Sequence, residues 1–258
     1  MLRNPLYVLE DIGQIKALIR EHPWATIVAA PAAPAAPAAP GSAAVPAAPF
    51  VPAAAGNPAP RLVASHYPVL LEDTADDAIS LVGHVGRPDD RALGLGGGGE
   101  ILVIIQGPHG YISPSWYPPD QVVPTWNHAT VHLWGVPQLL SEQETYRALS
   151  ALVDRFEAPM PHPRSLAADP EGTARIARGT VGFRLTATRF EARAKLSQTK
   201  EPRVRRAVIE GLRSDSAYAQ PALAELMERR ADPAPPEPDP ALPEPEPASP
   251  QPGAGPPG

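Results

Sequence analysis

The sequence predicts a mainly β fold with flanking helices, an α+β arrangement in which short strands close into a barrel. Three observations predict it. Short segments rich in β-formers alternate with glycine and proline turn signals. Helical periodicity is clear in only a few segments. More than half of the 37 prolines fall in residues 30–60 and 231–258, which leaves about 200 residues for one folded domain.

The first predicted elements are a helix and a short strand. Apolar residues recur at helical spacing: Ile12, Ile15, Leu18 and Ile19. This spacing predicts a helix over residues 10–21, and Pro23 ends it. Residues 24–28 are rich in β-formers and predict a strand.

Residues 30–60 interrupt the predicted barrel. Their Ala-Ala-Pro triplets match the turn of polyproline II, so we expect a disordered, semi-stiff, solvated loop whose ends join neighbouring strands. Lengthening a hairpin loop from about 5 to about 35 residues costs only about 1.7 kcal/mol. Residues 1–29 and 61–230 therefore form one expected domain, followed by a disordered, proline-rich acidic tail at 231–258.

Most of the remaining segments predict strands. The strand-like segments are residues 61–66, 79–85, 100–106, 110–115, 122–135 and 180–191. A glycine-rich turn at residues 94–99 precedes the third of them. Ser141 and Glu144 form a capping box that begins a helix over residues 141–157. A last helix begins near Pro202 and buries one apolar side: Val204, Val208 and Leu212.

Charge and composition limit the classes of function. The formal net charge is −6, but the tail supplies five carboxylates and no cation, so the folded part is near neutral. It therefore lacks the basic footprint of a nucleic-acid-binding domain. The sequence has no cysteine, which excludes disulfides and thiolate metal sites, and no run of about 18 apolar residues that would span a membrane. We expect a soluble, cytoplasmic protein.

Three segments carry a specific resemblance. They are residues 107–117 (GPHGYISPSWY), 123–135 (VPTWNHATVHLWG) and 195–200 (KLSQTK). In this order and spacing, and together with 63–66 and 83–87, the chain closely resembles the PaiB-like family of FMN-binding negative transcriptional regulators. The resemblance covers about residues 3–212, apart from the insertion.

This resemblance implies an FMN-binding split β-barrel that forms a homodimer, holds the flavin at the subunit interface and represses transcription. The chain departs from the family at several positions. The insertion and the acidic tail are additional, and His128 stands where a tyrosine is more usual. Pro88-Asp89 replaces a more typical Ala-Asn after Arg87, in a candidate phosphate loop.

FMN needs cationic or hydroxyl donors for its phosphate and an apolar or aromatic slot for its ring system. Arg87 lies between a strand and a turn, where its guanidinium could bind the phosphate or simply face solvent. Lys195, Ser197, Gln198 and Lys200 precede a helix start that would favour an anion. The alternative for this group is a helix entry with solvated lysines.

Two further groups are candidate cofactor contacts. Ser113, Ser115 and Trp116 lie at a strand end and suit a ligand or a dimer edge, or else half-buried aromatic packing in a dimer core. Thr125 and Asn127 lie within a predicted strand. Because a buried amide needs a partner, Asn127 should pair with the backbone or with flavin.

We assign neither a metal site nor catalytic residues. His128 and His132, four apart on a strand, lie about 13 Å from each other, too far for one ion with ligands at roughly 2.1 Å. No Ser-His-Asp order has a nucleophile-elbow context. The only compact basic patch is Arg203, Arg205 and Arg206 with Lys200, and it is either a weak DNA contact or a solvated helix face.

Three functions remain open. The first is a flavin-binding homodimeric negative regulator of transcription. The second is a flavin-dependent oxidoreductase or flavin reductase, because the fold alone does not select a chemistry. The third is a dimeric interaction module that has lost the cofactor.

Overall fold

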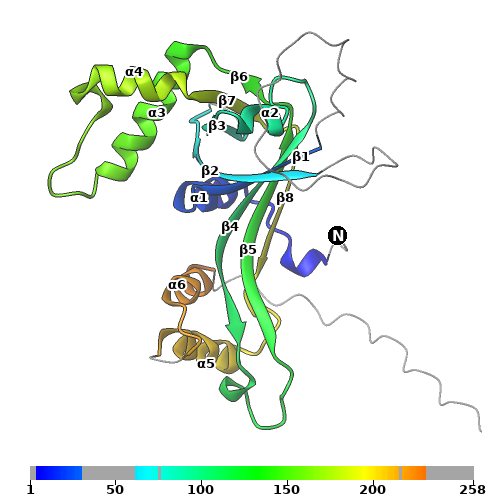
Figure 1. Ribbon diagram of the computed structural model, residues 1–258. Helices are drawn as coiled ribbons and strands as arrows, with labels where there is room; N and C mark the ends of the chain where they lie inside the picture. Colours follow the sequence, from blue (N-terminus) through cyan, green and yellow to red (C-terminus); the bar gives the residue numbers. More distant parts are fainter. Residues whose placement is uncertain (1–3, 31–61, 75–76, 215–216, 231–258) are drawn as a thin grey trace, which may run out of the picture.

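The protein contains one antiparallel sheet of eight strands in the order β6-β7-β3-β2-β1-β4-β5-β8 (Figure 1). The computed structural model describes residues 4–30, 62–74, 77–214 and 217–230. The strands are β1 (Trp24–Ala29), β2 (Val63–Leu71), β3 (Ser80–Gly86), β4 (Ile101–Ile112), β5 (Thr125–Gly135), β6 (Gln138–Leu139), β7 (Thr180–Thr186) and β8 (Arg189–Lys195).

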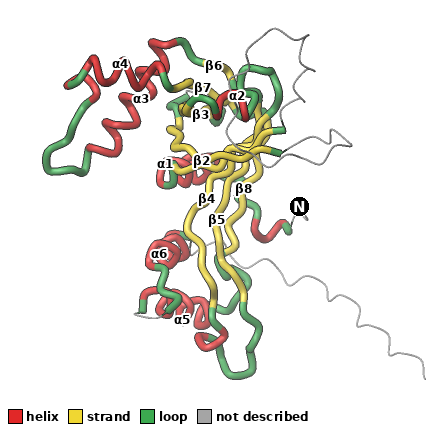
Figure 2. The backbone as a smooth tube through the Cα atoms, viewed as in Figure 1, coloured by secondary structure: helices red, strands yellow, loops and turns green. Residues whose placement is uncertain are grey.

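Strand β2 divides the sheet into two half-barrels. Its residues 63–68 pair with β1, whereas residues 69–71 pair with β3. One half therefore contains β1, β4, β5 and β8, and the other contains β3, β7 and β6 (Figure 2). The predicted split β-barrel with flanking helices is confirmed.

Helices cover both ends of this sheet. The α-helices are α1 (Ile12–Glu21), α2 (Asp89–Ala92), α3 (Glu142–Glu157), α4 (Pro170–Arg178), α5 (Pro202–Arg213) and α6 (Pro221–Arg229), with 3-10 turns at η1 (Pro5–Tyr7), η2 (Pro114–Trp116) and η3 (Leu166–Ala168). Helices α3 and α4 extend from the β3–β7 half, and α5 and α6 lie at the far end of β4 and β5 (Figure 1). No helix in the described ranges is long and apolar enough to cross a membrane.

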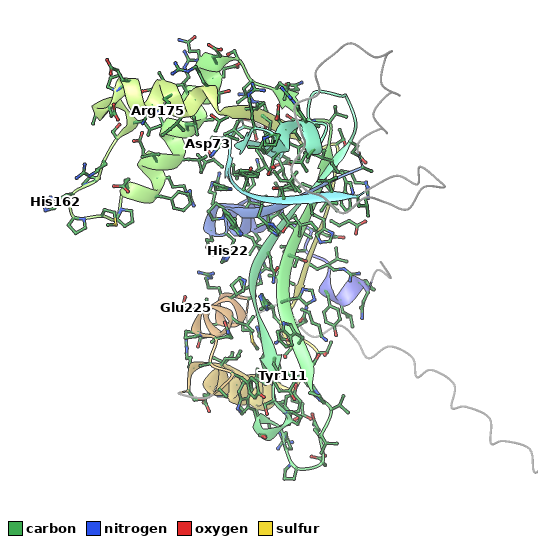
Figure 3. The ribbon with its side chains drawn as sticks, viewed as in Figure 1. His22, Asp73, Tyr111, His162, Arg175 and Glu225 are labelled. Carbon is green, nitrogen blue, oxygen red and sulfur yellow. The ribbon has the colours of Figure 1, made fainter. Side chains whose placement is uncertain are left out.

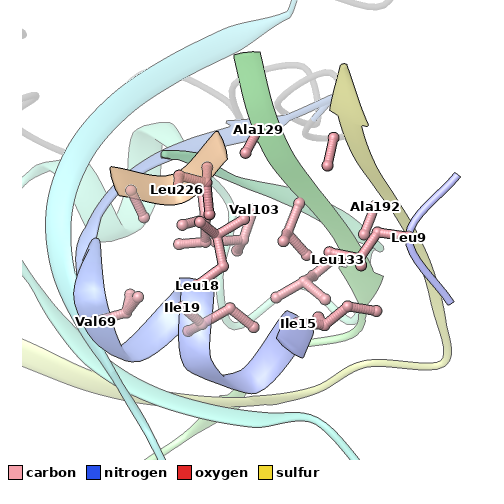
Figure 4. Packing of buried hydrophobic residues seen from close by; sticks show 14 of the residues in the cluster. Leu9, Ile15, Leu18, Ile19, Val69, Val103, Ala129, Leu133, Ala192 and Leu226 are labelled. Atoms are coloured by element: carbon pink, nitrogen blue, oxygen red, sulfur yellow. The ribbon is translucent and has the colours of Figure 1, made fainter. Parts of the chain in front are cut away.

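Helix α1 fills the space enclosed by the strands. Its buried side chains Ile15, Leu18 and Ile19 point toward Val103 and Leu133 of the sheet (Figure 4). Burial of such side chains contributes about 1.5–3 kcal/mol each. Leu226 of α6 joins the same cluster, so the terminal helices of the described chain share one core.

Several sequence predictions need correction. The expected strands at 100–106 and 110–115 are one strand, β4, with a bulge between Gln106 and His109. The expected strand at 180–191 is a hairpin of β7 and β8, since the chain turns between residues 186 and 189. Helices α4 and α6 were not predicted. The helix at 10–21 and the capping box of α3 are confirmed.

The structure describes almost none of the residues in the two proline-rich segments. Residues 31–61 and 231–258 lie outside the described ranges, so their expected disorder stays a prediction. The flanking strands are informative: Ala29 of β1 pairs with Val63 of β2 in an antiparallel ladder. The insertion therefore joins neighbouring strands, as its sequence predicted.

Candidate functional site

A cation and a hydroxyl meet where β8 ends and β5 begins. Lys195 lies opposite His128 in the β5–β8 ladder, and its Nζ donates a hydrogen bond to Thr125 Oγ1. The ring of Tyr7, from η1, lies with its centroid 5.8 Å from the same Nζ. An ammonium and a hydroxyl side by side are a donor pair that suits a phosphate.

His128 lies beside this pair, where its surroundings disfavour the protonated imidazole. Burial lowers the pKa of His128 below the ordinary value of 6.5, and the cations Lys195 and Arg193 lower it further. Its Nδ1 is buried without a hydrogen-bond partner in the described part of the chain. Across the sheet, His128 pairs with His109 of β4. The row His109–His128–Lys195 thus runs over three strands.

An aromatic pocket adjoins the same end of β4 and β5. It has a volume of about 410 Å³ and is lined mainly by His109, Tyr111, Trp126 and Tyr218. Trp126 Nε1 donates to His109 Nδ1 at 3.2 Å, and the rings of Tyr111 and Tyr218 lie 4.8 Å apart. Figure 3 labels Tyr111 near α5. The half-exposed rings of Trp126 and Tyr218 leave the pocket an aromatic wall open to a planar ligand.

Asn127 and Ser197 lie beneath this surface and are not exposed to it. Asn127 has no solvent exposure, and its Nδ2 donates to Ser197 Oγ at 2.9 Å and to Met227 Sδ at 3.5 Å. The sequence predicted a backbone or flavin partner for Asn127. The structure gives its Nδ2 a hydroxyl and a thioether instead of the backbone, and the flavin contact stays a prediction. Its Oδ1 is buried without a partner in the described ranges. Ser197 holds a positive φ of 56°, a conformation that the surrounding packing must stabilise.

Gln198 uses both ends of its amide to hold the backbone. Its Oε1 accepts from the Leu196 amide at 2.6 Å. Its Nε2 donates to the carbonyls of Ala194 and Leu6, at 2.8 and 2.9 Å. Gln198 thus fastens η1 to the end of β8. These bonds favour a supporting role for Gln198 beside Lys195.

The remaining candidates near this end belong to the β4–β5 loop and the start of α5. Lys200 Nζ donates to Gln121 Oε1 at 3.1 Å, beside a second pocket of about 490 Å³. Ser113 Oγ accepts from the Ser115 amide at 3.2 Å and begins η2.

Trp116 packs directly against helix α5. A Cβ at Gly211 would lie 2.5 Å from the Trp116 ring, so the contact requires a glycine there. Trp116 is therefore a packing residue of the loop within its own chain, and its predicted roles at a ligand or in a dimer core stay predictions.

Arg87 lies apart from all of these residues within one chain. It follows β3 beside α2, at the opposite end of the molecule from α5 and α6 (Figure 1). Its side chain is 51% exposed, and Nη1 pairs with Asp90 Oδ2 at 3.1 Å. The structure thus brings together Thr125, Lys195 and their neighbours, but not Arg87.

In the candidate DNA patch on α5, fewer cationic side chains are available to a ligand than the sequence suggested. Arg205 Nη2 donates to the carbonyls of Met227 and Arg230 and holds the end of α6. Arg203 pairs with Glu201 at 2.9 Å. Arg206 is exposed on the same helix. DNA contact by this patch stays a prediction.

Sequence reasoning missed Tyr7, His109 and Tyr218 as parts of this region. Tyr218 could not be placed because α6, which fixes its loop, was not predicted. His109 had a usable signal: it lies in a Gly-Pro-His-Gly sequence typical of a bulge, and the bulge shifts the register next to it. Tyr7 gave no local signal, because its contact with Lys195 is entirely tertiary.

Comparison with known proteins assigns the family. Residues 1–189 match the family model described as "Putative FMN-binding domain". The chain belongs to this family. The match includes Thr125 and ends before Lys195, so only the cation of the donor pair lies beyond it.

Individual relatives agree with this assignment. The chain is 30% identical to the protease synthase and sporulation protein PAI 2 of Bacillus subtilis over 167 residues, which cover 64% of this chain and 80% of that protein. The predicted PaiB-type resemblance is thereby confirmed, and it supports a flavin-binding protein.

Two solved structures are similar at low identity. An FAD- and haem-binding protein from Mycobacterium smegmatis has a TM-score of 0.46 and 14% identity, over 71% of this chain and 70% of that one. A flavocytochrome from Azotobacter vinelandii has a TM-score of 0.47 and 16% identity, over 95% and 90%.

Proposed function

We propose that the chain is a cytoplasmic, homodimeric FMN-binding regulator of the PaiB type that represses transcription. The observation that carries the flavin site is the pairing of Lys195 with Thr125 beside an aromatic pocket. Lys195 and Thr125 would hold the phosphate, and Trp126 and Tyr111 would line the ring system. When bound, the flavin supplies a redox-active ring; the residues around it bind it and shield it from water.

A homodimer is supported by the outer face of the β1–β4–β5–β8 half-barrel. Leu102, Ile104 and Trp134 alternate with the buried core residues of β4 and β5 and point away from the core. Trp24 and Trp126, on the same face, are 61% and 51% exposed. These apolar and aromatic side chains share the face with His128, Thr130 and His132 of β5, and such a face suits a two-fold interface in which it packs against its own copy.

Flavin stoichiometry and mass together test the proposal. We expect purified full-length protein, incubated with FMN, to sediment as a dimer with one FMN per subunit and flavin absorbance at about 450 nm. A protein that stays monomeric and colourless with excess FMN contradicts the proposal. That result would instead favour the cofactor-free interaction module.

A matched pair of variants links the dimer to the cofactor. Ile104→Glu places a charge in the middle of the outer face, and we expect a monomer with little bound flavin. Ile176→Glu, on α4, alters an apolar side chain that is 54% exposed outside this face. It should leave both mass and flavin content unchanged.

The regulator and the enzyme differ in their second partner. Because Arg203 and Arg205 are already engaged, the α5 patch gives DNA binding little support, and the flavin oxidoreductase remains the second candidate. A sequence-selective, salt-sensitive shift of promoter DNA would favour the regulator. Bleaching of bound flavin by NAD(P)H would favour the enzyme.

A further inference from the structure

Hydrogen-bond donors converge on a single carboxylate oxygen beside the turn after β3. Ser65 Oγ and Tyr67 Oη both donate to Asp89 Oδ2, at 2.7 and 2.8 Å. Tyr67 Oη also accepts from the Gly86 amide at 3.1 Å, which orients the phenol toward the carboxylate. Two hydroxyl donors on one oxygen are the arrangement that a phosphate oxygen would also accept.

The cation of the same turn is also neutralised from within the chain. Arg87 Nη1 pairs with Asp90 Oδ2 at 3.1 Å, and the Asp90 side chain is only 14% exposed. The hydroxyl pair and the guanidinium thus each have a carboxylate partner from α2. A phosphate dianion entering here would lie within a few ångströms of two carboxylates, and like charges at that range repel strongly.

We propose that Asp89 is an internal anion that fills this donor cluster and determines its ligand specificity: the native turn excludes phosphate. Arg87 is consequently not a phosphate ligand. A bound flavin keeps its phosphate at Lys195 and Thr125, and this last point alone rests on the proposed function. The hydrogen bonds from Ser65 and Tyr67 to Asp89 occupy this turn whether or not flavin is bound.

Replacing the carboxylate by a neutral amide tests the proposal. Asp89→Asn keeps the size of the side chain and removes its charge, so Ser65 and Tyr67 become available to an added anion, while Arg87 keeps its pairing with Asp90. The matched control is Asp90→Asn, which removes the same charge one residue away without touching the hydroxyl pair. The probe is inorganic phosphate, compared with sodium chloride at equal ionic strength on the full-length chain.

Phosphate-dependent thermal stability is the readout. For a site of about 1 mM affinity, 20 mM phosphate should raise the Tm of Asp89→Asn by about 4 °C. The native chain and Asp90→Asn should change by less than about 1 °C. Adding Ser65→Ala to Asp89→Asn should abolish the gain. If Asp89→Asn does not fold, Asp89→Ser provides the same neutral site with a smaller side chain.

Three outcomes would overturn the proposal. The first is phosphate stabilisation of the native chain that Ser65→Ala removes, because the turn would then accept phosphate beside Asp89. The second is an equal gain in Asp89→Asn and Asp90→Asn, which reflects net charge only. The third is no gain in either neutral variant. A failure to bind FMN changes none of these results, so the two proposals fail separately.

Discussion

The Lys195 end and the Arg87 turn contain similar residue types but differ in what those residues bind. Each region combines a cation with a hydroxyl group. At the first, the Lys195 ammonium has a neutral hydroxyl as its partner, and the pKa of the nearby His128 is lowered by burial and by the cations Lys195 and Arg193. At the second, the Arg87 guanidinium pairs with the carboxylate of Asp90.

The difference shows that an anion site is defined by uncompensated positive charge. Donors whose partners are carboxylates have already made their strongest hydrogen bonds, and a ligand must break these bonds before it can bind. Lys195 has no carboxylate partner in the described chain, so a phosphate adds an ion pair there without displacing one. We therefore expect a phosphate group to bind at the Lys195 end and to be excluded from the Arg87 turn.

The largest expected difference is in FMN affinity. If Lys195 holds the phosphate as proposed, Lys195→Met removes a charge-assisted hydrogen bond and should weaken FMN binding by roughly 10- to 100-fold. Arg87→Met, which removes a cation already paired with Asp90, should change the affinity less than about twofold. Flavin fluorescence titration measures both. Riboflavin, which lacks the phosphate, is the control ligand and should bind both variants like the native chain.

The reverse order of effects would contradict the assignment of the phosphate to the Lys195 end. If Arg87→Met weakens FMN binding and Lys195→Met does not, the phosphate lies at the turn after β3. That result would also contradict the proposed internal role of Asp89.

The fold was largely predictable because its signals are local. The helical spacing of Ile15, Leu18 and Ile19 and the capping box at Ser141 each lie within a few residues of sequence, and both are confirmed. The boundary between β7 and β8 was missed because the alternation of Val181, Phe183 and Leu185 was extended through the turn, although the buried alternation resumes at even positions in β8, at Ala192 and Ala194. Alternation predicts a strand but does not say where it reverses.

The candidate site was less predictable, because residue type does not reveal burial. Ser197, Gln198 and Lys195 are close together in sequence, and all could contact a phosphate. In the structure Ser197 bonds to Asn127 in the core, Gln198 bonds to backbone, and Lys195 reaches Thr125. Helix α6, which covers Asn127 through Met227, was not predicted. Without it the buried pair looked like surface donors.

The next largest expected effect concerns stability and distinguishes the role of the buried Asn127–Ser197 pair from that of Lys195. Asn127→Ala leaves the hydroxyl of Ser197 without its donor and opens space beneath α6. It should lower the free energy of unfolding by about 1–3 kcal/mol. Under conditions in which the variant is fully folded, its FMN affinity should change little, because Asn127 lies under the surface that carries Lys195. Urea unfolding and flavin titration measure the two quantities. A loss of FMN affinity as large as that of Lys195→Met would make Asn127 a direct cofactor contact.

The smallest expected effect is a pKa change that reports where the phosphate lies. Burial lowers the pKa of His128 and of His84, one at each end of the molecule. Because each folded pKa lies below the unfolded value, both groups contribute stability that is present above about pH 6.5 and is lost as the pH falls through the folded pKa.

A phosphate beside Lys195 favours the protonated form of His128, so FMN should raise the pKa of His128 by about one unit and leave the pKa of His84 unchanged. NMR titration of the histidine ring protons, assigned with His128→Gln and His84→Gln, measures both values. Riboflavin should move neither. If FMN raises the pKa of His84 instead, the phosphate is bound at the β3 end, and the neutral surroundings of Lys195 do not attract it.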